Sequence, residues 1–314
     1  MANIIEIISY ILLFFILYFQ VFFLLSFFND KKRKNWYKTP ENKDYFPTTS
    51  IIVPCFNEEA SLPLLLARTE PVVKNVFGGN EELIAVDDGS TDSTCRAVSG
   101  LDVTVLHNEE NEGKAGSLMR GFEHALARGA VGVITLDADG QHVPEEIPFF
   151  VKQSLDDPNA FLVGARRRDQ RRVSFWRYGA NRIVDFWIGW AAGQPIEDSQ
   201  SGFRLYPAGL LREMTLKHDR SRSFVFESEI VIEAARRGWA CQNISISVRL
   251  RAGPRPSHFR PVLDIARITR MVAWKLLSRG MYPTGLYRVL RGRNFLETSG
   301  HGDELRMVAR KSDK

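Results

Sequence analysis

Polar and acidic side chains follow short, β-branched apolar runs at three places in this chain of 314 residues. Runs of this kind, ending at a proline or an acidic cluster, are typical of buried strands that meet a loop. Carboxylates gathered at one place repel one another and lose hydration, so such a cluster favours a bound cation and a polar ligand. The three segments are residues 54–58, 87–94 and 137–142.

The third segment contains the oxygen ligands that a hard cation prefers. Asp139 and Gln141 suit Mg²⁺ or Mn²⁺, which would bridge a diphosphate. The three cysteines, Cys55, Cys95 and Cys241, are odd in number and far apart in the sequence, so they fit neither a disulfide framework nor a paired-cysteine metal site. We therefore expect ordinary reduced thiols and no Cys/His cluster that binds zinc.

Alternating strand and helix patterns place the three polar segments at one edge of a sheet. Strand patterns cover residues 50–54, 83–86, 103–106 and 131–136, and helical apolar spacing covers residues 60–77 and 115–128. This alternation predicts βαβ units in a mostly parallel, doubly wound α/β sheet. Ligands bind such sheets beyond the carboxyl ends of the strands, so we expect the chemistry immediately after the strands.

The N-terminal segment is almost continuously apolar from residue 4 to residue 28, with Glu6 as its only charge. About 20 such residues cross a bilayer core. The segment lacks the basic start and cleavage site of a signal peptide, and the basic residues 31–34 after it indicate that the following chain is cytoplasmic. We expect a single transmembrane anchor; a signal peptide and a buried helix are the alternatives.

The C-terminal region accounts for the chain's excess of positive charge. Residues 249–293 hold eleven Arg and Lys against one acid, a local charge of +10 in a chain of net charge +5. Beside a membrane anchor, a basic amphipathic helix predicts docking on anionic lipid head groups, and the alternative is a helix packed on the domain. No nucleic-acid-binding motif accompanies the charge, so no nucleic acid partner is expected. The predicted helix, residues 262–279, has one apolar face and carries Arg267, Arg270, Lys275 and Arg279 on the other side.

Five segments, in order, resemble the motifs of family 2 glycosyltransferases with the GT-A fold. The last of them narrows the resemblance to the dolichyl- and polyprenyl-phosphate sugar synthases, which move a sugar from a nucleotide to a lipid phosphate. The resemblance covers about residues 50–240, and its specificity lies in the order of the motifs. They are Val-Pro-Cys-Phe-Asn-Glu at 53–58, Val-Asp-Asp-Gly-Ser-Thr-Asp at 86–92, Asn-Glu-Gly-Lys-Ala-Gly at 111–116, Asp-Ala-Asp at 137–139 and Asp-Ser-Gln-Ser-Gly-Phe-Arg at 198–204.

The resemblance implies a role for each matching residue. Asp139 and Gln141 would ligate Mg²⁺ or Mn²⁺, and Asp198, Arg204 and Asp139 would take part in catalysis. The nucleotide-sugar-binding residues that it implies are Pro54, Phe56, Glu58, Val86, Asp88, Asp137, Ala138 and Arg166.

For other residues near the motifs, the sequence allows either a role in the site or a structural role. Lys114 belongs either to the site or to a solvated loop. His142 has no partner at ligand spacing, which favours a structural role. Residues 226–229 either pack near the acceptor site or open a surface helix.

Taken with these patterns, the resemblance implies an inverting, metal-dependent glycosyltransferase that uses a UDP- or GDP-sugar and a membrane lipid acceptor, with polyprenyl phosphate favoured. A lipid phosphate is already an anion and needs positioning more than a base. A hydroxyl acceptor on a glycan or glycolipid would need a base, for which Asp198 is the candidate. A non-catalytic, nucleotide-sugar-binding membrane scaffold is the third possibility.

Two absent motifs argue against two other classes of enzyme. No Gly-x-Gly-x-x-Gly follows the first strand, as a Rossmann dehydrogenase requires, and no Gln-x-x-Arg-Trp of a processive polysaccharide synthase occurs. The expected organisation is an anchor at 1–30, a linker at 31–48, a GT-A catalytic domain at 49–250 and a basic membrane-proximal region at 251–314.

Overall fold

The computed structural model describes residues 48–166, 175–214, 223–249 and 261–298. The predicted membrane anchor and nearly all of the linker lie outside these ranges, as does the basic segment 250–260. Among the helices within these ranges, none is long and apolar enough to cross a bilayer. The anchor at residues 1–30 therefore stays a prediction from the sequence.

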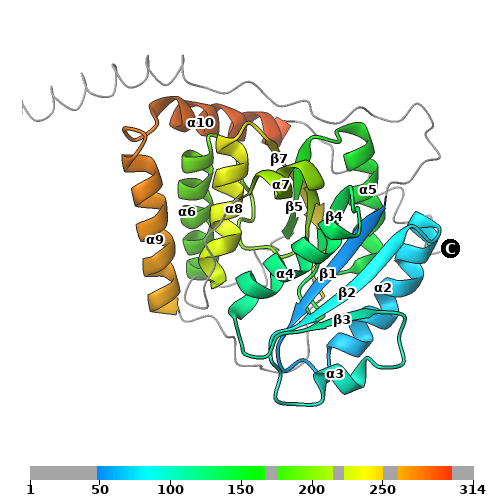
Figure 1. The fold of residues 1–314 in the computed structure, drawn as a ribbon. Coiled ribbons are helices and arrows are strands. Elements are labelled where there is room, and N and C mark those ends of the chain that lie inside the picture. The colour runs from blue at the N-terminus through cyan, green and yellow to red at the C-terminus, as the bar shows by residue number, and fades with distance from the viewer. Residues whose placement is uncertain (1–47, 167–174, 215–222, 250–260, 299–314) are drawn as a thin grey trace, which may run out of the picture.

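Seven strands form one mixed sheet in the described part of the chain (Figure 1). They are β1 (Thr49–Cys55), β2 (Glu81–Asp87), β3 (Thr104–His107), β4 (Gly132–Thr135), β5 (Ala160–Arg166), β6 (Arg204–Pro207) and β7 (Ala240–Ile246). Their spatial order is β3-β2-β1-β4-β6-β5-β7. β6 runs antiparallel to its neighbours β4 and β5, and the remaining pairs are parallel. The predicted mostly parallel α/β sheet is confirmed, and the reversed strand is an addition to it.

Helices cover both faces of this sheet. They are α2 (Leu62–Phe77), α3 (Thr94–Ala97), α4 (Gly113–Ala127), the 3₁₀ turn η1 (Pro144–Glu146), α5 (Ile147–Asp156), α6 (Phe175–Ala192), α7 (Ala208–Glu213), α8 (Ser223–Arg236), α9 (Pro261–Leu277) and α10 (Pro283–Thr298). Successive side chains of a strand point to opposite faces. Ile51 and Val53 of β1 therefore join the core beneath α2 and α5, whereas Ile52 joins the core shared with α4, α6 and α8.

Local signals set the ends of the first helix. Pro63 lies in the first turn of α2, where the missing N–H would have had no intrahelical partner. The helix ends at Gly78, whose φ of 61° is left-handed and suits glycine. The strands and helices predicted up to residue 136 agree with the observed elements to within about two residues at each end.

The C-terminal helices α9 and α10 pack on α6 and α8. Figure 1 shows α9 beside α6 and α8, with α10 against α6. Ile268, Val272 and Leu276 of α9 are buried in the core, so the predicted helix at 262–279 and its apolar face are confirmed.

One part of the predicted basic face of α9 is wrong. The Lys275 side chain is only 11% exposed, and its Nζ lies 3.1 Å from Glu229 Oε1 and also pairs with Glu233. Lys275 thus fixes α9 to α8 and does not face a membrane. The sequence could not indicate this because both carboxylates are more than 40 residues away along the chain.

Candidate active site

The reversed strand brings four loop segments to one edge of the sheet. Thr135 of β4 pairs with Arg204 of β6, so the residues before β6 lie beside the residues after β4. On the other side of β1, Cys55 pairs with Asp87, and the amide of Asp88 donates to the Cys55 carbonyl at 2.9 Å. The residues that follow β1, β2 and β4 therefore lie at the same edge of the sheet as the segment that precedes β6. The sequence predicted this position for the first three segments and not for the fourth.

Asp137 is held by a lysine and a histidine. Lys114 Nζ donates to Asp137 Oδ1 at 2.5 Å and to Glu227 Oε1 at 2.7 Å, and His142 Nε2 lies 3.1 Å from Asp137 Oδ2. Burial opposes the ionisation of Asp137, but the Lys114 charge and the His142 hydrogen bond outweigh it and hold the pKa of that carboxyl well below its usual range. Asp137 is therefore ionised and oriented, with one partner on each oxygen.

Gly202 makes room for this carboxylate. A Cβ at position 202 would lie 2.1 Å from Asp137 Oδ1 and 2.5 Å from its Cγ, far inside van der Waals contact. Since Gly202 comes just before β6, the segment that reaches the site from the reversed strand must pass Asp137 without a side chain. This close approach explains why a glycine stands in the Ser-Gly-Phe-Arg run, since any side chain there would clash with Asp137.

Asp139 and Gln141 lie in one tight turn beside Asp137. The amide of Gln141 donates to Asp139 Oδ1 at 2.9 Å, and Gly140 between them has a left-handed φ of 73°. Burial, and then the neighbouring charge of Asp137, raise the pKa of Asp139. A raised carboxyl pKa marks a place where more positive charge would be stabilising, and the donors are hard oxygens. These residues fit Mg²⁺ or Mn²⁺.

Arg166 and Asp198 form a two-pronged ion pair. Arg166 Nε donates to Asp198 Oδ2 at 2.6 Å, and Nη2 donates to Oδ1 at 2.9 Å. The Asp198 side chain is 1% exposed, whereas that of Arg166 is 30% exposed. The structure thus brings together a predicted phosphate-binding arginine and the predicted catalytic carboxylate of Asp198, and both Asp198 oxygens already accept from the arginine.

Arg204 is fully buried. Its Nε donates to the Ser201 carbonyl at 2.7 Å, Nη2 to the Ser199 carbonyl at 2.8 Å and Nη1 to the Glu227 carbonyl at 2.8 Å. The guanidinium therefore fixes the backbone of the segment before β6 and joins it to α8. Arg204 was predicted to take part in catalysis. We now expect it to position this segment instead of contacting the substrate.

Asp88 closes the start of α4. Its Oδ1 accepts from the Glu112 amide at 2.9 Å and from Asn108 Nδ2 at 3.0 Å, and its Oδ2 accepts from the Gly113 amide at 2.8 Å. A carboxylate there satisfies helix amides that have no partner within the helix. This places Lys114, in the first turn of the same helix, over Asp137.

The other predicted nucleotide-binding residues lie on the β1–β2 side of the site. Pro54 pairs in register with Val86, and both are buried. Phe56 and Glu58 are partly buried in the segment after β1, where the Glu58 amide donates to Thr94 Oγ1 at 2.8 Å. Ala138, buried, lies between the two carboxylates of the third segment.

Three members of the site were not assigned from the sequence: Lys114, His142 and Glu227. Lys114 and Glu227 are 113 positions apart, so no spacing pattern could link them. The sequence signal for Lys114 was its place as the one cation of the third motif, and the signal for Glu227 was its place as an acid near the start of a helix. His142 lies five positions after Asp137, and its partner is that carboxylate.

Comparisons with known proteins agree that the chain is similar to glycosyltransferases. A family model described as Glycosyl transferase family 2 matches residues 50–218. Undecaprenyl-phosphate 4-deoxy-4-formamido-L-arabinose transferase of Pseudomonas paraeruginosa is 35% identical over 178 residues, 55% of this chain and 50% of that protein. Undecaprenyl-phosphate mannosyltransferase of Micrococcus luteus is 30% identical over 199 residues, 60% of this chain and 77% of that protein. The chain thus spans about half the length of the arabinose transferases that it matches.

A solved structure shares the fold. Glucosyl-3-phosphoglycerate synthase from Mycobacterium tuberculosis, in complex with Mn²⁺ and UDP-glucose, matches with a TM-score of 0.53 and 23% identity over 74% of this chain and 79% of that chain. At this identity the likeness concerns the fold alone. It agrees with the GT-A-like sheet expected from the motifs.

Replacing Gly202 by alanine should displace Asp137 from Lys114 and His142. We expect Gly202→Ala to lower the free energy of unfolding by about 1–3 kcal/mol, because partly buried hydrogen-bonding groups lose their partners. Thermal unfolding of the full chain in detergent measures this. Gly132→Ala is the matched control, since a Cβ there meets nothing closer than 4.0 Å. Equal melting temperatures for the two variants would contradict the steric argument.

Removing the Lys114 ammonium should leave Asp137 and Glu227 unbalanced. Because the Lys114 and Asp137 side chains are 23% and 26% exposed, we expect Lys114→Met to cost about 2–3 kcal/mol near pH 7, toward the lower end for breaking a buried pair. The depressed pKa of Asp137 stabilises the fold above the unfolded carboxyl pKa, and this contribution is lost as the pH falls through the folded value.

The difference in unfolding free energy between the wild type and Lys114→Met should therefore become smaller as the pH falls below about 4. Urea unfolding at pH 7 and in acid measures the trend. Lys74→Met is the control, since Lys74 is 49% exposed and a surface ion pair of this kind contributes little to stability. A Lys114→Met deficit that does not change with pH would show that Asp137 is not the partner that matters.

Proposed function

Because the chain belongs to glycosyl transferase family 2, we propose that it is an inverting glycosyltransferase that moves a sugar from a nucleotide-sugar to a membrane lipid phosphate. The undecaprenyl-phosphate transferases that it resembles support a polyprenyl phosphate as the acceptor. The proposed catalytic domain is residues 49–250.

The observation that carries the proposal is the uneven charge balance at the sheet edge. Asp137 is balanced by Lys114, whereas Asp139, next to it, has a pKa raised by burial and by that neighbouring carboxylate. A divalent cation beside Asp139 would lower the cost of keeping two neighbouring carboxylates ionised, and a nucleoside diphosphate would be its polar ligand. When bound by Asp139 and Gln141, Mg²⁺ or Mn²⁺ would stabilise the negative charge of the leaving diphosphate. The fold neighbour was crystallised with Mn²⁺ and UDP-glucose, which is consistent with this.

For the donor, we propose that Pro54, Phe56, Glu58 and Val86 line the nucleoside pocket, with Glu58 accepting from the ribose. Asp88 would act indirectly, because its oxygens are engaged by the start of α4. Asp137 and Ala138 would approach the diphosphate, and Arg166, 30% exposed, would contact phosphate on its open side. UDP and GDP are both compatible with these contacts.

The Arg166–Asp198 pair favours a phosphate acceptor over a hydroxyl acceptor. A hydroxyl would need a base, and the candidate Asp198 has both oxygens bound by the guanidinium at 2.6 and 2.9 Å. A phosphate oxygen is already anionic and needs orientation by cations. The proposed step is direct displacement at the anomeric carbon by this oxygen, with inversion, while the nucleoside diphosphate leaves.

An exposed face of α9 supports a membrane acceptor. Leu263, Arg267, Arg270, Trp274 and Leu277 recur at helical spacing on one side of the helix. Trp274 is 71% exposed and Leu277 is 63% exposed, beside half-buried Arg267 and exposed Arg270. Large apolar side chains mixed with arginines suit the boundary between lipid head groups and acyl chains. We propose that this face lies on the cytoplasmic leaflet, next to the predicted single-pass anchor.

Transfer to lipid tests the proposed activity. Membranes containing the full chain are incubated with undecaprenyl phosphate and radiolabelled UDP- and GDP-sugars, and then extracted with organic solvent. We expect label in the lipid phase, reduced by at least about 100-fold in Asp139→Asn because diphosphate charge stabilisation is lost. Label only in glycan or water would favour the hydroxyl acceptor, and no turnover with any donor would favour a binding scaffold.

Changing the exposed face of α9 should weaken use of the lipid acceptor only. We expect Trp274→Ser with Leu277→Ser to raise the KM for undecaprenyl phosphate in vesicles by about tenfold, since buried apolar area is lost. The KM for the nucleotide-sugar should stay the same. Leu64→Ser, in an equally exposed leucine of α2 (69%), is the control. An unchanged lipid KM in the double variant would refute the docking face.

A further inference from the structure

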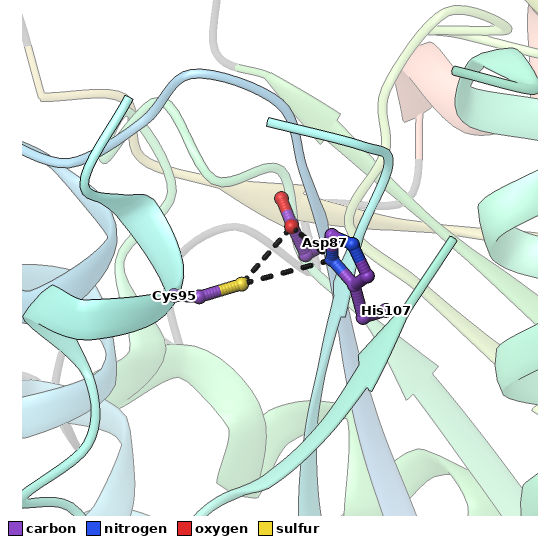
Figure 2. A group of neighbouring side chains, drawn as sticks. All are labelled: Asp87, Cys95 and His107. Atoms are coloured by element: carbon purple, nitrogen blue, oxygen red, sulfur yellow. Dashed lines mark hydrogen bonds and ion pairs between the residues drawn. The ribbon is translucent and has the colours of Figure 1, made fainter. Parts of the chain in front are cut away.

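A second cluster of ligand-type side chains lies outside the Asp137–Asp139 centre. Asp87 ends β2, His107 ends the neighbouring β3 and pairs with it in register, and Cys95 comes from α3 (Figure 2). The proposed glycosyl transfer assigns no role to any of the three. They are 8 and 12 positions apart in the sequence, so the cluster exists only through the pairing of β2 with β3.

The three potential ligand atoms already stand close to a metal-binding geometry. Asp87 Oδ2 lies 2.7 Å from His107 Nδ1 and 3.0 Å from Cys95 Sγ, and Sγ lies 3.9 Å from Nδ1. In tetrahedral zinc sites, bonds of about 2.0 Å to N and O and about 2.3 Å to S keep ligand atoms about 3.3–3.6 Å apart. Shifts of roughly half an ångström would therefore make three corners of such a site.

The surroundings fix the carboxylate and leave the cluster accessible. Asp87 Oδ1 accepts from the Ser90 hydroxyl and from the Ser90 amide at 3.3 Å, which leaves Oδ2 for the other two side chains. Such outer contacts orient the ligands of metal sites. Asp87 is buried, whereas the His107 side chain is 55% exposed, so an ion can reach the cluster from solvent.

We propose that Asp87, Cys95 and His107 bind a thiophilic divalent cation of the zinc type, separate from the Mg²⁺ or Mn²⁺ centre. A thiolate and an imidazole favour zinc over the hard cations that suit Asp139 and Gln141. Binding breaks the Cys95 S–H bond, forms a metal–sulfur bond and releases the proton to solvent. Without the ion, burial and the hydrogen bond to Asp87 raise the pKa of Cys95 to about 11 and keep it a thiol.

This cation site would stiffen the segment after β1. The Asn57 amide donates to Ser90 Oγ at 2.9 Å, and the Glu58 amide donates to Thr94 Oγ1 at 2.8 Å. Ser90 holds Asp87, and Thr94 precedes Cys95. An ion that joins Asp87 to Cys95 thus fixes both acceptors, and with them the segment proposed to receive the nucleoside. The ion-binding claim itself does not depend on glycosyl transfer.

Cobalt binding tests the site directly. The full chain, reduced and freed of metal, is titrated with Co²⁺ in excess Mg²⁺, which occupies oxygen-only sites. We expect one equivalent to give the near-ultraviolet thiolate-to-cobalt band, which added Zn²⁺ abolishes. Cys95→Ser should remove the band, and His107→Gln, a change at an exposed side chain, should weaken Co²⁺ binding by at least about tenfold. Cys241→Ala, which removes a buried thiol far from the cluster in sequence, should keep it.

Hydrogen exchange tests the coupling. We expect Zn²⁺ to slow amide exchange at residues 57 and 58 in the wild type and not in Cys95→Ser. A wild type without the cobalt band, or a band that survives both Cys95→Ser and His107→Gln, overturns the ion site whatever the transferase activity. A site that binds zinc with unchanged exchange at 57 and 58 overturns the coupling.

Discussion

The Lys114–Asp137 ion pair is the contact on which the arrangement of the site depends. It joins the first turn of α4 to the loop after β4, and through Glu227 it also reaches α8. Each partner is positioned by a different part of the fold: Asp88 fixes the start of α4, and His142 and Gly202 set the place of the Asp137 carboxylate. Together with Glu227, this pair joins three segments that are distant in the sequence, so it depends on the folded arrangement of β4, α4 and α8.

This pair divides the charged residues into two groups. One group is satisfied within the protein: Asp88 by amides, Arg204 by carbonyls, and Asp137 by Lys114 and His142. Asp139 represents the second group, because burial and the neighbouring charge of Asp137 raise its pKa. A bound cation lowers the cost of keeping such a carboxylate ionised. We therefore propose that the first group holds the site and that the second group meets the substrate and its cation.

Much of the site followed from sequence because its central elements are local. Asp137, Asp139 and Gln141 lie within five positions, directly after a strand that its β-branched residues predict. The strand-to-loop rule for parallel sheets then placed residues 54–58 and 87–94 at the same edge.

The remainder depends on long-range pairing that local patterns do not encode. The four residues of β6 carry no signal for strand direction, yet their reversal is what brings Asp198 and Gly202 to the carboxyl ends of the other strands. The Lys275 bridges to α8 and the Asp87–Cys95–His107 cluster have the same origin. The spacing of the cysteines along the sequence did not indicate a metal site, because the candidate ligands of that cluster belong to three different elements.

Calorimetric binding of UDP and GDP to the purified full chain, with Mn²⁺ or with EDTA, tests the central claim most directly. We expect one nucleotide to bind at least about tenfold more tightly with Mn²⁺, since a cation at Asp139 and Gln141 would contribute more than about 1.4 kcal/mol. This gain should vanish in Asp139→Asn. Equal affinity with Mn²⁺ and with EDTA would show that the sheet edge needs no cation to receive a diphosphate, and would refute the proposed metal site.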